Sequence, residues 1–454
     1  MTTFLAFIFV LGVLIFVHEL GHFLMARRIG VRVLTFSLGF GPKILSFRRG
    51  DTEYCVSAIP LGGYVKMAGE NPEEVRTGSS DEFLSKTKWQ RFQVLIMGPI
   101  MNLALALVVM ALVLYQGAEL PAYTQQPVVV GPATDTAFAQ GIVGPGYSSG
   151  WLQDPSIDIQ PGDRILAVNA TPVETWEAFS MQVLPRAGRR LRLTIDRDGK
   201  RFDQEVVPPA VGKYEMGEIG VLPPLRPQIN AVNAGEPAAE AGLQKGDVML
   251  AINGEKHVLQ PRVIEVIRAN EGQTLAFEIL RDGQAMTVNV TPRTVDDTVR
   301  IGAQINPLET RTVDPTLLGA FKLSAERNWE WSSLIVTTLV GLFTRDTPVT
   351  QLMGPVAIAG LSGEAAEAGW IQLFSLMAMI SLNLGLLNLM PIPVLDGGHI
   401  TILALEGLSR RDFSMKVKEK MMLAGFVLLL TLMVTVIYND LARIQWVQNL
   451  LPWR

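Results

Sequence analysis

Cysteine, histidine and charged residues are scarce in this sequence of 454 residues. The single cysteine, Cys55, excludes a framework of disulfide bonds and a zinc cluster built on cysteine thiolates. Charged residues make up 18% of the chain, below the roughly 25% of ordinary soluble domains. The formal net charge of −4 gives no basic field that would favour a nucleic-acid partner. With 48% hydrophobic residues and a mean hydropathy of +0.28, the composition predicts a membrane protein with soluble parts.

Four apolar segments approach the roughly 20 residues that cross a bilayer. They are residues 4–26, 94–115, 371–390 and 421–438. A shorter apolar run at 334–343 cannot span alone and is expected at the membrane interface. The first segment has no basic residue before it and no small-residue cleavage site after it, so we expect a retained span rather than a signal peptide.

Basic residues are concentrated in two loops. Residues 27–91 contain eleven Lys or Arg, residues 405–420 contain five, and residues 117–135 contain none. Because basic loops stay in the cytoplasm, we expect these two loops there, with both termini and residues 117–330 on the other side.

The region 117–330 contains two copies of one pattern. Its landmarks recur at one constant offset: Gly162-Asp163 as Gly246-Asp247, Asn169 as Asn253, Arg197-Asp198-Gly199 as Arg281-Asp282-Gly283, and Pro208 as Pro292. A constant offset indicates a tandem duplication. Each copy is expected to hold a strand, a helix and a hairpin around the Asp-Gly turn. The expected strands are 164–168, 191–196 and 202–207, then 248–252, 274–280 and 285–290, with helices at 174–183 and 261–269.

The second copy carries the stretch AAEAGLQKGD at residues 238–247, which together with this order of elements resembles the PDZ domains of bacterial membrane proteases. The resemblance implies that peptide C-termini bind by adding a strand to a sheet edge. The corresponding stretch of the first copy, residues 141–160, is long and rich in Gly and Ser, so it departs from the pattern. The alternative is that both copies are packing domains without a ligand.

The first apolar segment contains an H-E-x-x-H motif, from His18 to His22. On a helix, positions i and i+4 share a face, so both imidazoles can reach one zinc ion, with Glu19 beside them as a general base. Ionisable groups at membrane depth are costly and usually mark function. The alternative is a polar patch that faces a helix partner.

A zinc hydrolase needs a third protein ligand and an open position. The stretch NLMPIPVLDGGH, from Asn388 to His399, ends the third span at two prolines before an apolar run resumes. Broken helices occur in a bilayer only where they line a cavity. Asp396 is therefore the candidate ligand and His399 its rival. His257 lies in an expected surface turn and is not expected to bind the metal.

These features together resemble the site-2 protease family: the H-E-x-x-H motif in a span, the later N-x-x-P-x-P-x-x-D-G motif and the inserted PDZ pair. The resemblance covers essentially the whole chain. It implies one Zn²⁺ per chain held by His18, His22 and Asp396, with Glu19 as the general base.

The resemblance also implies a role for further residues. Asn388, Pro391 and Pro393 would support substrate entry and the active-site loop. Residues 60–67, which include Gly62, Gly63 and Tyr64, match a membrane-associated β-hairpin whose edge strand holds the substrate, and locally 43–48 and 54–58 flank a Gly50-Asp51 turn. The segment from Gly98 to Asn102 matches the family's second span, either as a catalytic element or as a kink with a close-packing glycine.

The expected fold is a polytopic α-helical membrane protein with four transmembrane helices, a membrane-associated β-hairpin and two tandem PDZ-like α+β domains. The expected segments are the first span (1–26), a cytoplasmic loop with the hairpin (27–93), the second span (94–116), two PDZ-like domains (117–221 and 222–309), an interfacial connector (310–370), the third span with the Asp-Gly motif (371–408), a basic loop (409–420), the fourth span (421–445) and a tail (446–454).

The resemblance implies an intramembrane zinc metalloprotease of the bacterial inner membrane, with the zinc site towards the cytoplasm and the PDZ-like domains in the periplasm. Its implied partners are the lipid bilayer and single-span membrane proteins, namely an anti-sigma factor already trimmed by a first protease and remnant signal peptides. The 54–67 region would hold an unwound substrate segment by backbone pairing. An inactive PDZ-bearing scaffold and a transporter are the alternatives. Intact motif residues oppose the first, and the lack of an inverted repeat opposes the second.

Overall fold

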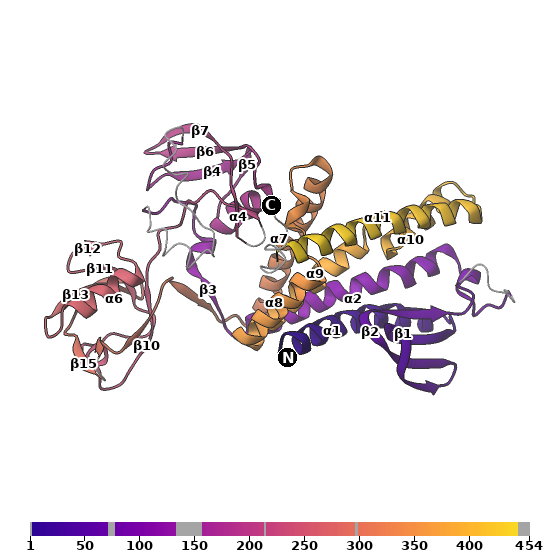
Figure 1. Cartoon of the computed structure of the whole chain (residues 1–454), viewed down its shortest axis with the longest axis horizontal. Helices are drawn as coiled ribbons and strands as arrows, with labels where there is room; N and C mark the ends of the chain where they lie inside the picture. The colour runs from indigo at the N-terminus through magenta and orange to yellow at the C-terminus, as the bar shows by residue number, and fades with distance from the viewer. Residues whose placement is uncertain (1, 71–77, 133–156, 213–214, 296–297, 444–454) are drawn as a thin grey trace. The chain divides into compact units, whose positions relative to one another are not determined.

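The computed structural model describes residues 2–70, 78–132, 157–212, 215–295 and 298–443. The chain forms two compact units. The helical unit comprises Met1–Gly117, Asp314–Thr337 and Leu352–Arg454, and the outer unit comprises Ala118–Val313 and Thr338–Gln351. Figure 1 shows the helices and strands of both.

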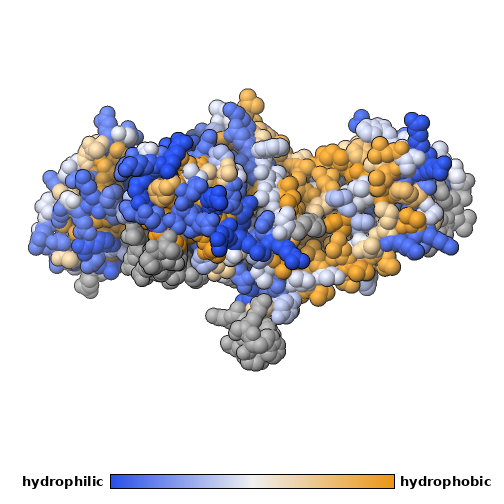
Figure 2. All heavy atoms as spheres, turned by 90° about the horizontal axis from the view of Figure 1, so that it is seen from above, coloured by the Kyte–Doolittle hydropathy of each residue, from blue (hydrophilic) through white to orange (hydrophobic). Residues whose placement is uncertain are grey.

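Four helices of the helical unit are long and apolar enough to cross a membrane, which confirms the four expected spans. They are α1 (Thr2–Arg28), α2 (Lys88–Tyr115), α9 (Trp370–Asn388) and α11 (Met415–Ala442). Each helix extends beyond its apolar stretch at one or both ends, as at the Thr87 capping box before α2. Large apolar side chains on α11 are more than half exposed, including Leu423 (62%), Phe426 (53%) and Val434 (58%). Figure 2 shows such surface as an extended orange area over the long helices, as expected for contact with lipid.

Beyond residue 313, the described residues form three further α-helices: α7 (Leu317–Thr344), α8 (Pro355–Ala368) and α10 (Asp396–Leu408). The apolar run 334–343 is the last part of α7, so it belongs to a longer helix than we expect from the sequence. The buried Asp440 near the end of α11 accepts hydrogen bonds from the backbone N–H groups of Gly354, Val356 and Ala357, each at 3.0 Å. This carboxylate therefore caps the N-terminus of α8, where backbone donors lack helical partners.

Between α1 and α2 the chain forms two long strands, β1 (Val33–Arg49) and β2 (Thr52–Met67), where we expect a short hairpin. Each strand changes partner along its length, so the two strands make four paired segments. The segment 53–56 pairs with 45–48 on one side and with 35–38 on the other, and 35–38 also pairs with 63–66. The segment 63–67 is therefore an edge of this sheet. The sheet packs on α1 through Phe23 and Phe36, whose rings lie 5.4 Å apart.

Each repeat of the outer unit contains one sheet of four or more strands, beside smaller two-stranded sheets. In the first repeat (residues 118–221) the strand order is β5-β4-β6-β7, and in the second repeat (residues 222–309) it is β14-β13-β11-β10-β17, with β12 beside β11. The elements of the first repeat are β4 (Arg164–Val168), β5 (Thr171–Pro172), α4 (Trp176–Val183), β6 (Leu191–Arg197), β7 (Lys200–Val206), β8 (Ala210–Val211) and β9 (Met216–Gly217). Those of the second are β10 (Gln228–Val232), α5 (Pro237–Glu240), β11 (Val248–Ile252), β12 (Glu255–Lys256), α6 (Gln260–Ala269), β13 (Leu275–Arg281), β14 (Gln284–Val290), β15 (Arg293–Val295), β16 (Thr298–Arg300) and β17 (Ala303–Asn306).

The landmarks that the two repeats share make the same polar contacts in both. The Nε–H of Arg197 donates to Asp163 at 2.7 Å, and that of Arg281 donates to Asp247 at 2.7 Å. Both carboxylates are 1% exposed. A buried carboxylate needs such partners, because burial without them is costly. The arginine and aspartate that recur in the sequence therefore connect each hairpin to its Gly-Asp turn by an ion pair.

The two ends of the outer region lie side by side. Strand β3 (Ala118–Pro121) pairs antiparallel with β18 (Thr310–Val313), so that Pro121 lies opposite Thr310. Most of the stretched segment 141–160 of the first repeat falls in 133–156, outside the described residues.

Candidate metal centre

Helix α1 and the first residue of α10 bring three donor side chains together. His18 Nε2 lies 3.2 Å from His22 Nε2 and 3.2 Å from Asp396 Oδ2, and His22 Nε2 lies 3.4 Å from the same oxygen. Donors that bind a tetrahedral zinc ion at about 2.0–2.1 Å lie about 3.3–3.4 Å apart. The triangle therefore fits zinc, and two imidazoles with a carboxylate are a donor set that zinc accepts. Within the described ranges, no other group of three His, Cys, Asp or Glu side chains is placed to hold a metal.

Asp396 is delivered by a tight loop between α9 and α10. A Cβ on Gly397 would lie 2.3 Å from the backbone of Leu389, and one on Gly398 would lie 2.2 Å from the carbonyl oxygen of Ile392. The loop thus folds back onto the first turn of α10, which only glycines at these two positions permit. Val394 has a φ of +99°, a strained conformation for a β-branched residue.

Helix α2 lies directly against the two histidines. The carbonyl oxygen of Val94 accepts a hydrogen bond from His22 Nδ1 at 2.8 Å. A Cβ on Gly98 would lie 2.3 Å from His22 Nε2, and the amide of Asn102 lies 3.2 Å from His18 Nδ1. Val94, Gly98 and Asn102 follow one another at intervals of four residues, so they share one face of α2. Sequence reasoning identified Gly98 and Asn102 but missed Val94, because a backbone carbonyl leaves no trace in residue identity.

The edge of the β1–β2 sheet passes beside Glu19. A Cβ on Gly63 would lie 3.0 Å from Glu19 Cγ and 2.8 Å from Ile15 Cγ2. On either side of Gly63, a Cβ on Gly62 would overlap the Phe40 ring, and the Tyr64 ring stacks on Phe40 with centroids 6.2 Å apart. The structure therefore brings Gly63 of the expected substrate-holding segment next to the expected general base.

The remaining candidates lie around the loop that carries Asp396. Asn388 is the last residue of α9, and Pro391 and Pro393 lie in the loop itself. A Cβ on Gly425 of α11 would lie 2.1 Å from the carbonyl oxygen of Pro393, so α11 packs closely on this loop.

The two other histidines stand apart from the donor triangle. His399 is exposed on the first turn of α10 and is not one of the three clustered donors. His257 is exposed in the outer unit, directly after β12, with a φ of +58°.

Comparison with known proteins matches residues 6–432 to the family model described as "Peptidase family M50". The chain is 33% identical to the "Regulator of sigma-E protease RseP" of Salmonella typhimurium, over 97% of this chain and 98% of the relative. It is 32% identical to the protein of the same name from Escherichia coli K12, with the same coverage. It is also 30% identical to the "Zinc metalloprotease RasP" of Geobacillus kaustophilus, over 97% of each chain.

A methyl group at Gly98 is expected to displace both histidine rings, since its Cβ would also lie 2.9 Å from His18 Cε1. Gly98→Ala should therefore weaken zinc binding by about tenfold or more, measured by competition with a chelator in detergent. Gly12→Ala on α1 is the matched control, because a Cβ there meets nothing within 4 Å. Equal zinc affinity in the two variants would show that Gly98 does not hold the rings in place.

Proposed function

Because this chain belongs to peptidase family M50 and is a zinc metalloprotease with four candidate membrane spans, we propose that it cleaves peptide bonds within the transmembrane segment of single-span membrane proteins. One observation carries the proposal. Two of the three clustered donors, His18 and His22, lie on α1, a helix that is itself a candidate span, and Asp396 reaches them from the start of α10. Ionisable groups in such a position are costly unless they serve a function there.

The proposed roles follow from the arrangement of the side chains. His18, His22 and Asp396 hold one zinc ion per chain. Zinc, when bound, supplies a Lewis acid that polarises a carbonyl and makes water more acidic. Glu19, next to His18 and beside Gly63, accepts a proton from the attacking water and returns it to the leaving amine.

The substrate must be extended at the point of cleavage, because a helix keeps its carbonyl groups in i→i−4 hydrogen bonds. We propose that the edge segment 63–67 of β2 pairs with the unwound segment beside Glu19. The first half of β2 is unsuited to this task, since 53–56 is already paired on both sides. Asn388 precedes the loop before Asp396, Pro391 and Pro393 lie within it, and all three would guide the segment into the site.

Glu19→Gln should lower cleavage of a trimmed single-span substrate by roughly 100- to 10,000-fold while zinc stays bound. Purified wild type and variant, reconstituted in proteoliposomes, are compared for cleavage within the span and for zinc content. Full activity of the variant would remove Glu19 from the chemistry. If wild type and variant both retain zinc but cleave none of several trimmed substrates, the alternative of an inactive PDZ-bearing scaffold would be favoured.

Helix-breaking residues in the substrate should accelerate cleavage. A Leu→Gly change beside the scissile bond lowers the cost of unwinding by about 1 kcal/mol, which is about fivefold in rate. The same change at the far end of the substrate span is the control. Rates that do not respond to either change would contradict the need for unwinding.

We propose that residues 27–91 and 405–420 face the cytoplasm and that the outer unit faces the periplasm of the bacterial inner membrane. The basic residues of the two loops support this orientation. Arg27 and Arg28 close α1, and Lys88 opens α2, so the donor triangle lies nearer to the basic end of these helices. The zinc site would then lie towards the cytoplasm.

The outer unit is proposed to act as a filter that admits substrates only after a first protease has removed their bulky outer domains. The proposed substrates are an anti-sigma factor and remnant signal peptides. Cleavage of an anti-sigma factor would place the chain in an envelope stress response. The relatives from Salmonella typhimurium and Escherichia coli are named regulators of sigma E, which supports the anti-sigma factor as a substrate.

Removal of residues 122–309 should let the protease cut an untrimmed substrate. The pairing of Pro121 with Thr310 allows a short Gly/Ser turn to replace the deleted region without moving its ends. In proteoliposomes, the deletion variant should cut trimmed and untrimmed substrates at similar rates, whereas wild type should cut only the trimmed substrate. An untrimmed substrate that stays intact with the deletion variant would contradict size exclusion.

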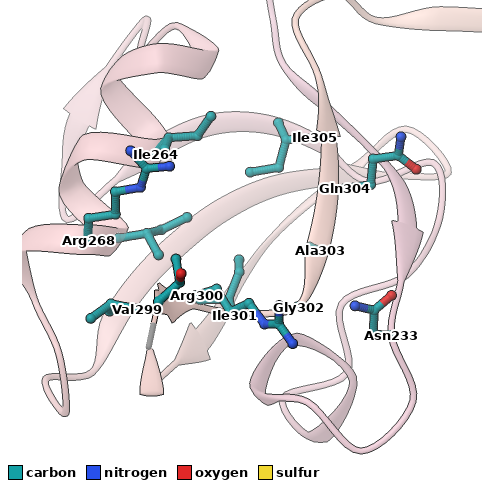
Figure 3. A pocket seen from close by; sticks show the side chains of 12 residues that line it. Asn233, Ile264, Arg268, Val299, Arg300, Ile301, Gly302, Ala303, Gln304 and Ile305 are labelled. Carbon is teal, nitrogen blue, oxygen red and sulfur yellow. The ribbon is translucent and has the colours of Figure 1, made fainter. Parts of the chain in front are cut away.

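A second candidate function is peptide binding by the second repeat, favoured by a cavity of about 290 Å³ between α6 and the loop and strand at 298–305. Figure 3 shows Ile264 and Arg268 on α6 facing this cavity from one side and Ile305 on β17 from the other. Strand β17 is an edge of its sheet, so its free side can pair with an added strand. An apolar floor with Arg268 at the wall suits a peptide C-terminus with an apolar last residue.

The matching loop of the first repeat has an acidic residue where the second has a basic one. Glu218-Ile219-Gly220 corresponds to Arg300-Ile301-Gly302, and both isoleucines are 2% exposed. Burial raises the pKa of Glu218 to about 7, so this position is at best neutral and becomes negative as the pH rises through 7. A peptide carboxylate is therefore expected to prefer the second repeat.

Ile264→Asp should weaken binding of a fluorescent peptide with a free apolar C-terminus by about tenfold or more in the full-length chain, because a charge enters the apolar cavity. Ser180→Asp is the matched control, at the corresponding position on α4 of the first repeat. The same peptide with an amidated end should bind more weakly to wild type. Equal affinity for both peptides would contradict carboxylate recognition.

A further inference from the structure

The protons on the two histidine rings are determined by their partners on α2. The carbonyl oxygen of Val94 lies 2.8 Å from His22 Nδ1 and can only accept a hydrogen bond. The ring of His22 must therefore carry its proton on Nδ1, which leaves the lone pair of Nε2 free to bind a metal. Asn102 contacts His18 in the same way, with its side-chain amide 3.2 Å from His18 Nδ1.

The amide of Asn102 has two orientations, which exchange its nitrogen and oxygen. As placed, Nδ2 faces His18, and the buried Oδ1 has no hydrogen-bond partner among the described residues. If Nδ2 donated to Nδ1, the neutral ring of His18 would carry its proton on Nε2. That nitrogen faces His22 and Asp396, and a protonated nitrogen cannot bind zinc.

We propose that Asn102 is a positioning residue for the metal centre, with its amide turned over so that Oδ1 accepts a hydrogen bond from Nδ1–H of His18. This inference rests on the proposed zinc site. The contact directs Nε2 of His18 towards the metal and makes that nitrogen a better donor, as outer partners of metal-bound histidines do. It also gives the buried Oδ1 a donor, which a buried oxygen needs.

The geometry of the two helices explains why Asn102 serves this purpose. His18 and His22 are four residues apart on α1, and Val94 and Asn102 lie four residues on either side of Gly98 on α2. Gly98 lets α2 approach closely enough for a partner on each side to reach one ring. Ser381 of α9 donates a hydrogen bond to the backbone carbonyl of Asn102 at 2.8 Å. The side chain and the backbone of Asn102 therefore have separable partners.

Zinc affinity of the full-length chain in detergent tests the proposal without any cleavage reaction. Asn102→Ala should weaken zinc binding by about 10- to 100-fold. Asn102→Asp keeps an acceptor and loses the donor, so it should bind zinc nearly as tightly as wild type. Ser381→Ala is the matched control, since it removes a contact to the same residue but leaves the amide in place. Equal weakening by Asn102→Ala and Ser381→Ala, or loss of zinc in Asn102→Asp that is as severe as in Asn102→Ala, would overturn the proposal.

The proton on His18 gives a second measurement, and its position in the wild-type ring tests the proposal without any Asn102 variant. The chain has four histidines, so ¹⁵N-histidine spectra of the zinc-loaded protein are assignable with His257→Gln and His399→Gln. We expect His18 to carry its proton on Nδ1 and this proton to exchange slowly with water. Exchange should be faster in Asn102→Ala, while the Nδ1 proton of His22 is unchanged. A proton on Nε2 of His18, or exchange that Asn102→Ala does not change, would contradict the proposal.

The two hypotheses fail in different ways. A wild-type chain that binds zinc but leaves every transmembrane substrate intact contradicts the proposed function, and the zinc affinities still measure the role of Asn102. A wild-type affinity in Asn102→Ala contradicts the positioning role and leaves the proteolytic function standing.

Discussion

Helices α1 and α2 come into close contact at Gly21 and Gly98, and the candidate metal centre depends on this contact. A Cβ on Gly21 would lie 2.4 Å from the carbonyl oxygen of Met97, and one on Gly98 would lie 2.3 Å from His22 Nε2. No side chain fits between the helices at this level, so the two imidazoles lie directly against the polar groups of α2. Inside a membrane such groups have few other partners, and helices with small residues at their interface pack in this way.

The same principle governs the other two components of the site. Gly397 and Gly398 let the loop after α9 close on α10, which places Asp396 beside the histidines. Gly63 lets the sheet edge lie against Glu19. The donor set, the expected base and the expected substrate edge are therefore joined by backbone approaches at glycines, so that little freedom remains in the position of any of them. A site held in this way suits chemistry that needs accurate placement of a peptide bond.

Much of this arrangement could be predicted from the sequence, because long apolar runs and spaced motifs have direct physical meaning. The four spans and the landmarks of the tandem duplication correspond to structural elements, and β4 and β11 begin and end at the expected residues. The course of β1 and β2 could not be predicted, since a strand that changes partners midway has no pattern of its own in the sequence. Helix α8 was also missed. Its small residues give a weak apolar signal, and its N-terminus is completed by Asp440, far along the chain.

At the site, residue types predicted the donors but not their surroundings. H-E-x-x-H has a fixed helical geometry, so His18 and His22 were recognisable in isolation. The broken helix already favoured Asp396 over His399 in the sequence, and the fold of the loop brings Asp396 to the two histidines and leaves His399 exposed. The contact of Val94 through its carbonyl oxygen has no counterpart in the sequence, because every residue has such a group.

The donor triangle draws its members from opposite ends of the chain, and this has a consequence for the biogenesis of the protein. Ribosomes deliver α1 early and α10 only after the whole outer region has been made. Until α10 emerges, the nascent chain carries two of the three donors and no loop to bring in the carboxylate. With the proposed zinc ligands, a newly made molecule is therefore expected to be inert during insertion and to become competent only when α10 joins α1. A protease that is made in the same membrane as its substrates would gain a safeguard from this order of synthesis.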